Sequence, residues 1–385
     1  MFARTGIAAL FLSALAVLSL RCGLGIDSDP LGPFSLIYVS DGSNHVQVHK
    51  IDPLTGKLTV SAATVALTGP SNVEPMPLPG LSFLGVADAT LGVVGSFSIH
   101  SGTGSLSTTV SGTANTGGGS QPLQGTALPG KPFLYVPLSG GITLAGFSVD
   151  QVTGSLSSLA GSPTSVAGGG ITQAVAFNPA GTFAYVAKKN ISADCSVPSI
   201  SAECVMVFSV DRTTGALTSI PGAQRSTGGI APTDLAMDSQ NRVLVVANFS
   251  SNNVQSFKVN SATGGITASV TGPYPTATGA RYVAFHPNGD FVYIANNGSN
   301  SVSIFSIVPS SGNLATVDLT FVVAATPIRP VFDPTGEFMY VGSNSTNQLF
   351  GYRVDSSTGT LSALEGSPYD TLTSPAFAVL VQVPR

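Results

Sequence analysis

The chain has 385 residues, of which only 9% are charged, and its formal net charge is −4. No run or stripe of basic residues occurs, which argues against a nucleic-acid surface and against an electrostatic membrane patch. The absence of tryptophan and the abundance of glycine, serine and threonine are typical of a protein made of short β-strands and tight turns.

The first residues have the order of an export signal. An apolar run over residues 6–20 follows Arg4 and is too short for a comfortable membrane span. Cys22 comes next, and this order resembles a bacterial lipoprotein signal in which the cysteine is lipidated, although Arg21 stands where such signals have a small residue. We predict an export signal over residues 1–22 and a flexible tether over 23–33. The product is then either lipid-anchored at Cys22 or a cleaved periplasmic or secreted protein.

A pattern of four predicted strands recurs along residues 34–385. Its clearest copy covers residues 279–317, with strands at 282–285, 291–295, 301–307 and 314–319. One glycine, in T-G-x-L or a near relative, marks the last turn of each copy: Gly56, Gly104, Gly154, Gly215, Gly264, Gly312 and Gly359. A period near 50 residues built of four strands is the signature of propeller blades. The sequence predicts an all-β, seven-bladed β-propeller over residues 34–385.

The two ends of this repeat are incomplete in a complementary way. The first copy lacks its leading strand, whereas residues 374–383 follow the last copy with nothing after them. We predict that residues 376–380 complete blade one as its innermost strand, which closes the ring and removes two sheet edges. The alternative is an unpaired C-terminal strand. The second copy is degenerate around residues 83–87.

One interval between marker glycines is 61 residues long, because residues 188–203 form a loop insertion in the fourth copy. Cys195 lies in this insertion, and Cys204 directly follows it. A disulfide between them would close a short loop and increase the stability of the folded protein by on the order of 2 to 3 kcal/mol. A zinc site is the rival interpretation, but it lacks ligands, since none of the four histidines is near in sequence: His45, His49, His100 and His286.

In a propeller, the innermost strands line a central channel, and the loops between second and third strands gather at one face. Aligning the innermost strands on Phe285 places one residue from each of six blades at an equivalent channel position: Gln124, Ala174, Asp234, Tyr282, Arg329 and Phe377, with Arg281 one step before Tyr282. Arg281 and Arg329 could bind a carboxylate or phosphate. Alternatively, one of them pairs with Asp234 and ties blades together. His286 is predicted to be a turn residue on the opposite face.

A recurring F-x-P-x-G-x-F-x-Y-V-A-N, followed by S-V-x-x-F-x-V-D-x-x-T-G-x-L, is clearest at residues 177–186, 205–217, 285–296 and 332–361. This pattern resembles the seven-bladed lactonase family, which includes 6-phosphogluconolactonase-like enzymes, and it is shared by YVTN-type repeat propellers. The resemblance implies a G-P-R-H stretch entering an innermost strand and an N-E pair after the next strand. Here those positions read Gly279-Ala-Arg-Tyr282 and Asn296-Asn297, so Tyr282 and Asn297 replace the histidine and the glutamate.

Two functions are predicted from these residues. We rank first an exported envelope propeller that binds a small anionic molecule, a peptide or a glycan at its channel face, because the acid/base pair that proton transfer would use is replaced. The second is a lactone hydrolase of the 6-phosphogluconolactonase type, with Arg281 and Tyr282 catalytic, Asp234 an alternative proton carrier, and Asp234, Asn297 and Arg329 binding the ligand. We predict no metal, no cofactor, no nucleic-acid partner, and a monomer that contacts membranes only through an N-terminal lipid.

Overall fold

The computed structural model describes residues 34–41, 44–67, 73–80, 82–117, 121–166, 170–189, 203–323 and 325–383. The contacts of the chain separate Pro33–Arg385 from the residues before it, and we describe this unit by itself. The predicted signal, the tether, Cys22 and Cys195 lie outside the described residues.

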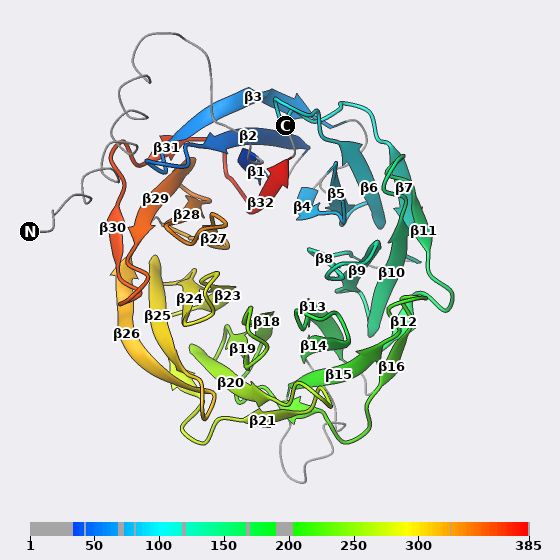
Figure 1. Cartoon of the computed structure of the whole chain (residues 1–385), viewed down its shortest axis with the longest axis vertical. Helices are drawn as coiled ribbons and strands as arrows, with labels where there is room; N and C mark the ends of the chain where they lie inside the picture. Colours follow the sequence, from blue (N-terminus) through cyan, green and yellow to red (C-terminus); the bar gives the residue numbers. More distant parts are fainter. Residues whose placement is uncertain are drawn as a thin grey trace, which may run out of the picture. The chain divides into compact units, whose positions relative to one another are not determined.

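Seven antiparallel sheets are arranged in a ring, with one edge strand of each sheet nearest its centre (Figure 1). Each sheet is one blade, and every element of the described residues is a strand. This confirms the all-β, seven-bladed propeller. The blades, from the innermost strand outward, are as follows: blade one, β32 (Phe377–Val383), β1 (Phe34–Ser40), β2 (His45–Ile51) and β3 (Leu58–Ala66); blade two, β4 (Val73–Pro77), β5 (Phe83–Asp88), β6 (Val93–Ser98) and β7 (Gly112–Asn115); blade three, β8 (Thr126–Ala127), β9 (Phe133–Leu138), β10 (Thr143–Val149) and β11 (Leu156–Ser158) with β12 (Thr164–Ser165); blade four, β13 (Ile171–Phe177), β14 (Phe183–Lys189), β15 (Cys204–Val210) and β16 (Leu217–Ser219) with β17 (Arg225–Ser226).

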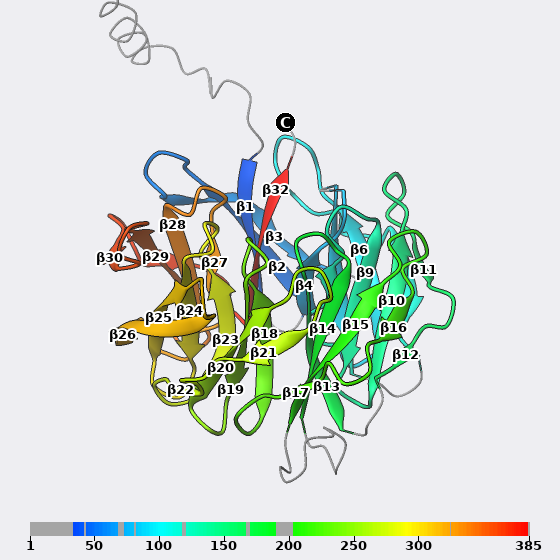
Figure 2. The ribbon, with the colours of Figure 1, turned by 60° about the horizontal axis from the view of Figure 1, so that its bottom comes forward.

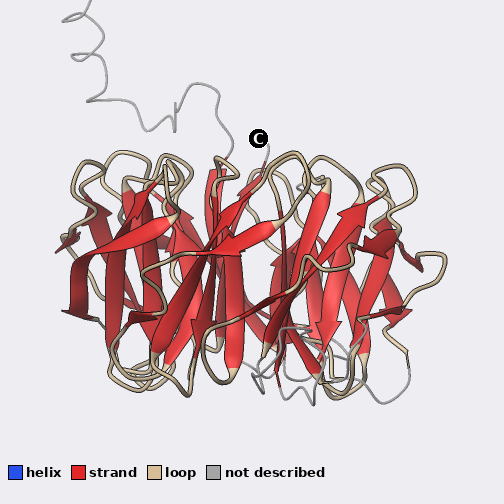
Figure 3. Ribbon diagram, turned by 90° about the horizontal axis from the view of Figure 1, so that it is seen from below, coloured by secondary structure: helices blue, strands red, loops and turns tan. Residues whose placement is uncertain are grey.

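The remaining three blades follow the same order: blade five, β18 (Pro232–Met237), β19 (Val243–Asn248), β20 (Asn253–Val259) and β21 (Ile266–Ala268) with β22 (Tyr274–Pro275); blade six, β23 (Ala280–Phe285), β24 (Phe291–Asn296), β25 (Ser301–Val308) and β26 (Asn313–Val322); blade seven, β27 (Val331–Phe332), β28 (Phe338–Ser343), β29 (Gln348–Val354) and β30 (Leu361–Ala363) with β31 (Tyr369–Asp370). Turns and loops between strands gather at the two faces of this ring (Figure 3).

The ring is closed by the C-terminal strand, as the sequence predicts. β32 pairs with β1 over its full length, from Phe34 opposite Val383 to Ser40 opposite Phe377. Figure 2 shows the two strands, blue and red, side by side. The strand covers Phe377–Val383 rather than the predicted 376–380, because all seven residues of β1 pair with it.

The hydrophobic core lies between the blades rather than inside each one. All six residues of β24 are buried, as are those of β19 and β28. The second strand of a blade is covered by a neighbouring blade on each of its two faces. Its residues are therefore apolar without interruption, instead of alternating between apolar and polar. One core cluster, for example, joins Val245 of β19 to Val292 of β24.

A single type of hydrogen bond recurs at all seven joints between blades. A hydroxyl group of one blade donates to the carbonyl of the marker glycine in the next blade. In five blades the donor is the tyrosine of the second strand: Tyr38 to Gly104, Tyr135 to Gly215, Tyr185 to Gly264, Tyr293 to Gly359 and Tyr340 to Gly56. These tyrosines are fully or almost fully buried, so each hydroxyl needs a partner.

Blades two and five have no tyrosine at this position, and the neighbouring strand supplies the hydroxyl. Ser96 of β6 donates to Gly154 over 2.6 Å, and Ser256 of β20 donates to Gly312 over 2.7 Å. Ser96 lies opposite Gly85, and Ser256 lies opposite Val245, the two residues that stand in place of the tyrosine. The joint therefore keeps its hydrogen bond although the residue that makes it changes.

Cys204 begins β15 and is disulfide-bonded. Its predicted partner Cys195 is outside the described residues, so the pairing of these two cysteines stays a prediction. Among the described residues, none forms a helix of the length and apolarity that membrane crossing requires.

Candidate functional site

The innermost strands of blades four, five and six each carry a β-bulge near the start of the strand. The register of pairing shifts between Thr172 and Ala174, between Pro232 and Asp234, and between Ala280 and Tyr282. A bulge inserts one unpaired residue and re-aims the side chains beside it. Asp234 and Tyr282 each follow such a residue, and Arg281 is itself the inserted residue of β23.

Asp234 and Arg329 form an ion pair in the channel. Nη2 of Arg329 donates to Oδ1 of Asp234 over 2.8 Å, and the N–H of Val283 donates to Oδ2 over 2.7 Å. The Asp234 side chain is 3% exposed and that of Arg329 is 27% exposed. Burial raises the pKa of Asp234, and the charge of Arg329 opposes this shift. The pair joins blade five to blade seven. This agrees with the alternative prediction from the sequence, in which one of the two arginines pairs with Asp234 and ties blades together.

Tyr282 lies beside two guanidinium groups. The Cζ atoms of Arg281 and Arg329 are 5.3 and 5.5 Å from the centre of its ring, which is the distance of a cation–π contact. Burial raises the pKa of the Tyr282 phenol, against the charge of Arg281, so the phenol stays protonated and can donate a hydrogen bond. Arg281 itself is exposed and forms no ion pair with any described residue.

A second carboxyl group completes this part of the channel. Glu74 of β4 is only 8% exposed. Burial raises the pKa of Glu74 to about 7, while the backbone N–H of Gln124 and the charges of Arg281 and Arg329 act in the opposite direction. A carboxyl group that titrates near neutral pH is suited to general acid–base catalysis. We call Glu74, Asp234, Arg281, Tyr282 and Arg329 the channel group.

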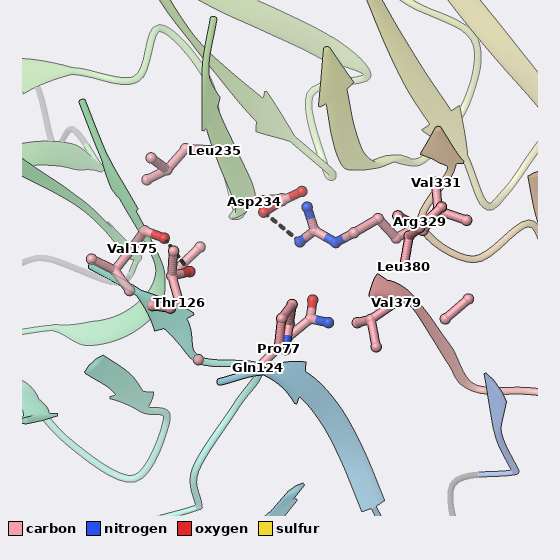
Figure 4. Close-up of a pocket in the computed structure, with 14 residues that line it drawn as sticks. Pro77, Gln124, Thr126, Val175, Asp234, Leu235, Arg329, Val331, Val379 and Leu380 are labelled. Atoms are coloured by element: carbon pink, nitrogen blue, oxygen red, sulfur yellow. Dashed lines mark hydrogen bonds and ion pairs between the residues drawn. The ribbon is translucent and has the colours of Figure 1, made fainter. Parts of the chain in front are cut away.

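A cavity of about 370 Å³ adjoins the channel group. The Asp234–Arg329 pair forms part of its wall, and Figure 4 shows that the wall also includes Gln124, Val331 and Leu380. This volume lies in the range of small-molecule sites, roughly 300 to 1,000 Å³. The remaining lining residues are Pro77, Gly125, Thr126, Ala127, Ala174, Val175, Leu235, Ala378 and Val379.

The structure thus brings together four of the five residues that the sequence singles out for ligand or catalysis, namely Asp234, Arg281, Tyr282 and Arg329. Asn297 is not among the channel group. It lies in the loop after β24, where its Nδ2 donates to the carbonyl of Pro327 over 3.4 Å. Of the other aligned channel positions, Gln124 and Ala174 line the cavity.

Glu74 is the residue that sequence reasoning missed. Its strand reads V-E-P-M-P, and two prolines argue against a strand unless it is a sheet edge, which β4 is. One signal was available. Glu74 lies nine residues before Phe83, the first residue of β5, just as Tyr282 lies nine residues before Phe291. The register agrees, because Glu74 lies opposite Ala87 and Tyr282 opposite Ala295.

The histidines lie away from the channel group. His286 is buried in the turn after β23, where its Nε2 contacts the carbonyl of Gly336 at 2.8 Å and ties blade six to blade seven. His49 is buried between blades one and seven beside Gln47 and Thr371. His45 pairs with Asp41 at 2.7 Å, and His100 contacts Thr103 in an exposed turn. Within the described ranges, no three His, Cys, Asp or Glu side chains gather in a metal-binding arrangement.

The chain belongs to the family described as lactonase, seven-bladed β-propeller, because the family's sequence profile matches residues 77–285 and 267–373. This finding confirms the resemblance that the repeat motifs carry. No curated protein matches the sequence.

Solved structures share the fold at low sequence identity. A candidate 6-phosphogluconolactonase from Bacteroides uniformis superimposes with a TM-score of 0.73 at 16% identity, covering 91% of this chain and 100% of its own. The periplasmic gluconolactonase of Pseudomonas aeruginosa superimposes with a TM-score of 0.71 at 19% identity, again covering 91% and 100%. At these identities the similarity is one of fold.

Proposed function

We propose that this protein is a lactone hydrolase that acts at the channel group. The observation that carries the proposal is one buried carboxyl group, Glu74, with a pKa of about 7 beside the guanidinium groups of Arg281 and Arg329, in the channel of a lactonase-family propeller. The names of the similar structures, two of which refer to lactonases acting on gluconate derivatives, support the same reaction class. This reverses the ranking that the sequence alone favours.

In the proposed reaction, ionised Glu74 accepts a proton from a water molecule as its oxygen attacks the carbonyl carbon of the lactone. Negative charge develops on the carbonyl oxygen, where Arg281 stabilises it. The ring C–O bond then breaks. Glu74 returns the proton to the departing alkoxide, which leaves a hydroxy acid and an ionised Glu74.

Tyr282 and the ion pair have supporting roles in this proposal. The protonated phenol of Tyr282 donates a hydrogen bond to the substrate, and it stands where the family resemblance implies a histidine. Asp234 is a poor proton acceptor, because both of its oxygens already accept hydrogen bonds. We therefore assign it the positioning of Arg329 rather than the proton transfer.

The test is the hydrolysis of 6-phosphogluconolactone, glucono-δ-lactone and simple γ-lactones, corrected for the uncatalysed rate, as a function of pH. Because Glu74 must be ionised to act as a base, kcat/KM should rise with pH and level off above the pKa of about 7. Glu74→Gln should lower turnover by roughly a hundredfold or more and remove this limb of the profile. Arg281→Ala should lower turnover by roughly a hundredfold.

The control is Glu365→Gln, which removes an exposed carboxylate away from the channel and should leave the rate and its pH profile unchanged. A wild-type rate no faster than background for every lactone would refute the proposal. An active Glu74→Gln variant with an unchanged pH profile would remove Glu74 from the mechanism.

A channel that binds without catalysis is the second candidate, and the residues at positions 282 and 297 favour it, since neither is the His or the Glu that the resemblance implies. Under this alternative, a small anionic molecule, a peptide or a glycan would bind beside the exposed guanidinium of Arg281. Calorimetry would detect binding of gluconate or a hydroxy acid to the wild type, with loss of binding in Arg281→Ala, and no lactone would be hydrolysed.

We also propose that the protein is exported as a monomer, with residues 1–22 as the signal and Cys22 as the site of a lipid when one is attached. The order of residues in this segment supports export, and the fold is shared with a periplasmic enzyme. A disulfide between Cys195 and Cys204 would suit an oxidising compartment. Fractionation of cells into cytoplasm, periplasm and membranes tests the location, and recovery in the cytoplasm would overturn it.

A further inference from the structure

We infer that the lactone taken by this site carries a hydrocarbon arm, which lies in the cavity beside the Asp234–Arg329 pair, rather than a chain of hydroxyl groups. The inference rests on the proposed function and narrows its substrate class. It is drawn from the chemistry of the cavity wall, which differs sharply from that of the channel group.

Most of the cavity wall is aliphatic. Eight aliphatic residues from the innermost strands of four blades and from the closing strand line it: Pro77, Ala174, Val175, Leu235, Val331, Ala378, Val379 and Leu380. Val379 and Leu380 belong to β32, so the closing strand supplies part of this wall. An apolar wall stabilises a ligand by removing its hydrocarbon surface from water.

Each polar side chain of the wall already forms at least one hydrogen bond within the protein. Nε2 of Gln124 donates to the carbonyl of Pro75 over 3.0 Å, and Oγ1 of Thr126 donates to the carbonyl of Val175 over 2.9 Å. Both oxygens of Asp234 accept hydrogen bonds. A polyhydroxylated arm would bring several donors and acceptors into this space, and each one left without a partner would weaken binding.

One polar atom points to where the polar end of the ligand lies. Nε of Arg329 is buried and has no hydrogen-bond partner among the described residues. Its other two nitrogens bind Asp234 and the carbonyl of Val283. A carbonyl or carboxylate oxygen of the ligand would satisfy Nε, which places the lactone ring at the channel group and its hydrocarbon arm along the aliphatic wall.

The experiment measures kcat/KM for γ-valerolactone, γ-hexalactone, γ-octalactone and γ-decalactone, which share one ring and differ in the length of the alkyl arm. We expect a rise of about fourfold for each added methylene, the equivalent of about 0.8 kcal/mol per buried CH₂, until the arm fills the cavity. Glucono-δ-lactone and 6-phosphogluconolactone, measured in parallel, should be poorer substrates than γ-octalactone.

Val331→Thr is the matching variant, because it keeps the shape of the side chain and places a hydroxyl in the wall. It should reduce the gain per methylene by about half or more. The control is Val341→Thr in β28, since Val341 is also buried but does not line the cavity. It should leave the gain unchanged, and melting temperatures of both variants would separate misfolding from altered preference.

The outcomes distinguish this inference from the proposed function. Faster hydrolysis of the sugar lactones, with a flat alkyl series, would overturn the hydrocarbon arm and leave lactone hydrolysis standing. No hydrolysis of any lactone, together with calorimetric binding of γ-hydroxy acids that strengthens with chain length, would support the arm and overturn the enzymatic function. Neither hydrolysis nor binding of any of these compounds would overturn both.

Discussion

The channel and the joints that connect neighbouring blades are built from the same repeat. They differ in how similar the equivalent residues are from one copy of the repeat to the next. Every joint has a hydroxyl group bound to the carbonyl of a marker glycine. In the channel, by contrast, the residue nine positions before the second strand is of a different type in each of blades two to seven: Glu74, Gln124, Ala174, Asp234, Tyr282 and Arg329.

This difference separates the residues that hold the ring together from the residues that form the candidate site in the channel. The packing between blades uses the second and third strands, and its hydrogen bond survives even where serine replaces tyrosine, as Ser256 does beside Val245. The innermost strand is a sheet edge, so its side chains are free to differ from blade to blade without loss of the ring. Seven copies of one unit can therefore surround a site in which each residue is unique.

The largest effect should come from a marker glycine. Gly359 has a φ of +75°, and a Cβ added there would lie 2.4 Å from the ring of Phe291 in the preceding blade. Gly359→Ala should lower the free energy of unfolding by about 3 to 4 kcal/mol, since left-handed backbone strain adds to overpacking.

Gly222 provides the control for Gly359, because its φ is +76° and no atom lies within 4 Å of the added Cβ. Gly222→Ala should cost only the backbone strain, about 1 to 2 kcal/mol. Urea unfolding of both variants measures the difference. Equal losses would mean that the joint makes no special demand on its glycine.

A smaller effect should come from the ion pair of the channel. Asp234→Ala leaves the guanidinium of Arg329 without its carboxylate, and because that side chain is partly exposed we expect a loss of about 2 to 3 kcal/mol rather than the full cost of an isolated buried charge. The double variant Asp234→Ala with Arg329→Met should recover part of this loss. A double-mutant cycle by urea unfolding gives the coupling, and a coupling near zero would show that the pair does not tie blades five and seven.

The smallest effect should come from a single joint hydroxyl. Tyr293→Phe removes the bond to Gly359, which is 2.7 Å long, and should cost about 1 kcal/mol without altering turnover. Tyr282→Phe is the opposite case, with a change in turnover and little change in melting. If Tyr293→Phe altered turnover as much as Tyr282→Phe did, the division between joint and channel would fail.

The fold could be predicted from the sequence because its signal is repeated. Turn glycines such as Gly264 and Gly312 recur at nearly constant spacing, and the missing strand of the first copy matches the surplus strand at the C-terminus. The replacement of tyrosine by serine at two joints could not be foreseen, because it requires knowing which residues of adjacent strands lie opposite each other.

The channel group was only partly predictable, for two physical reasons. The bulge that makes Arg281 an inserted residue of β23 depends on backbone pairing and leaves no mark in the pattern of apolar residues. Glu74 lies between Val73 and Pro75 in the blade that departs most from the repeat, where prolines hide the strand. Counting from Phe83 would have found it, since the spacing within a blade is kept even where residue types are not.

The closing strand has a consequence for the order in which the ring is assembled. β1, β2 and β3 leave the ribosome first, but the innermost partner of β1 is β32, which is translated last. The bond from Tyr340 to Gly56 likewise joins residues 284 positions apart, and contacts of such high order form slowly. Nascent domains usually acquire structure from the N-terminus onward. Here we expect blade one, whose strands β1 to β3 are synthesised before the other blades, to be completed last. The inner edge of β1 stays unpaired until β32 has been synthesised.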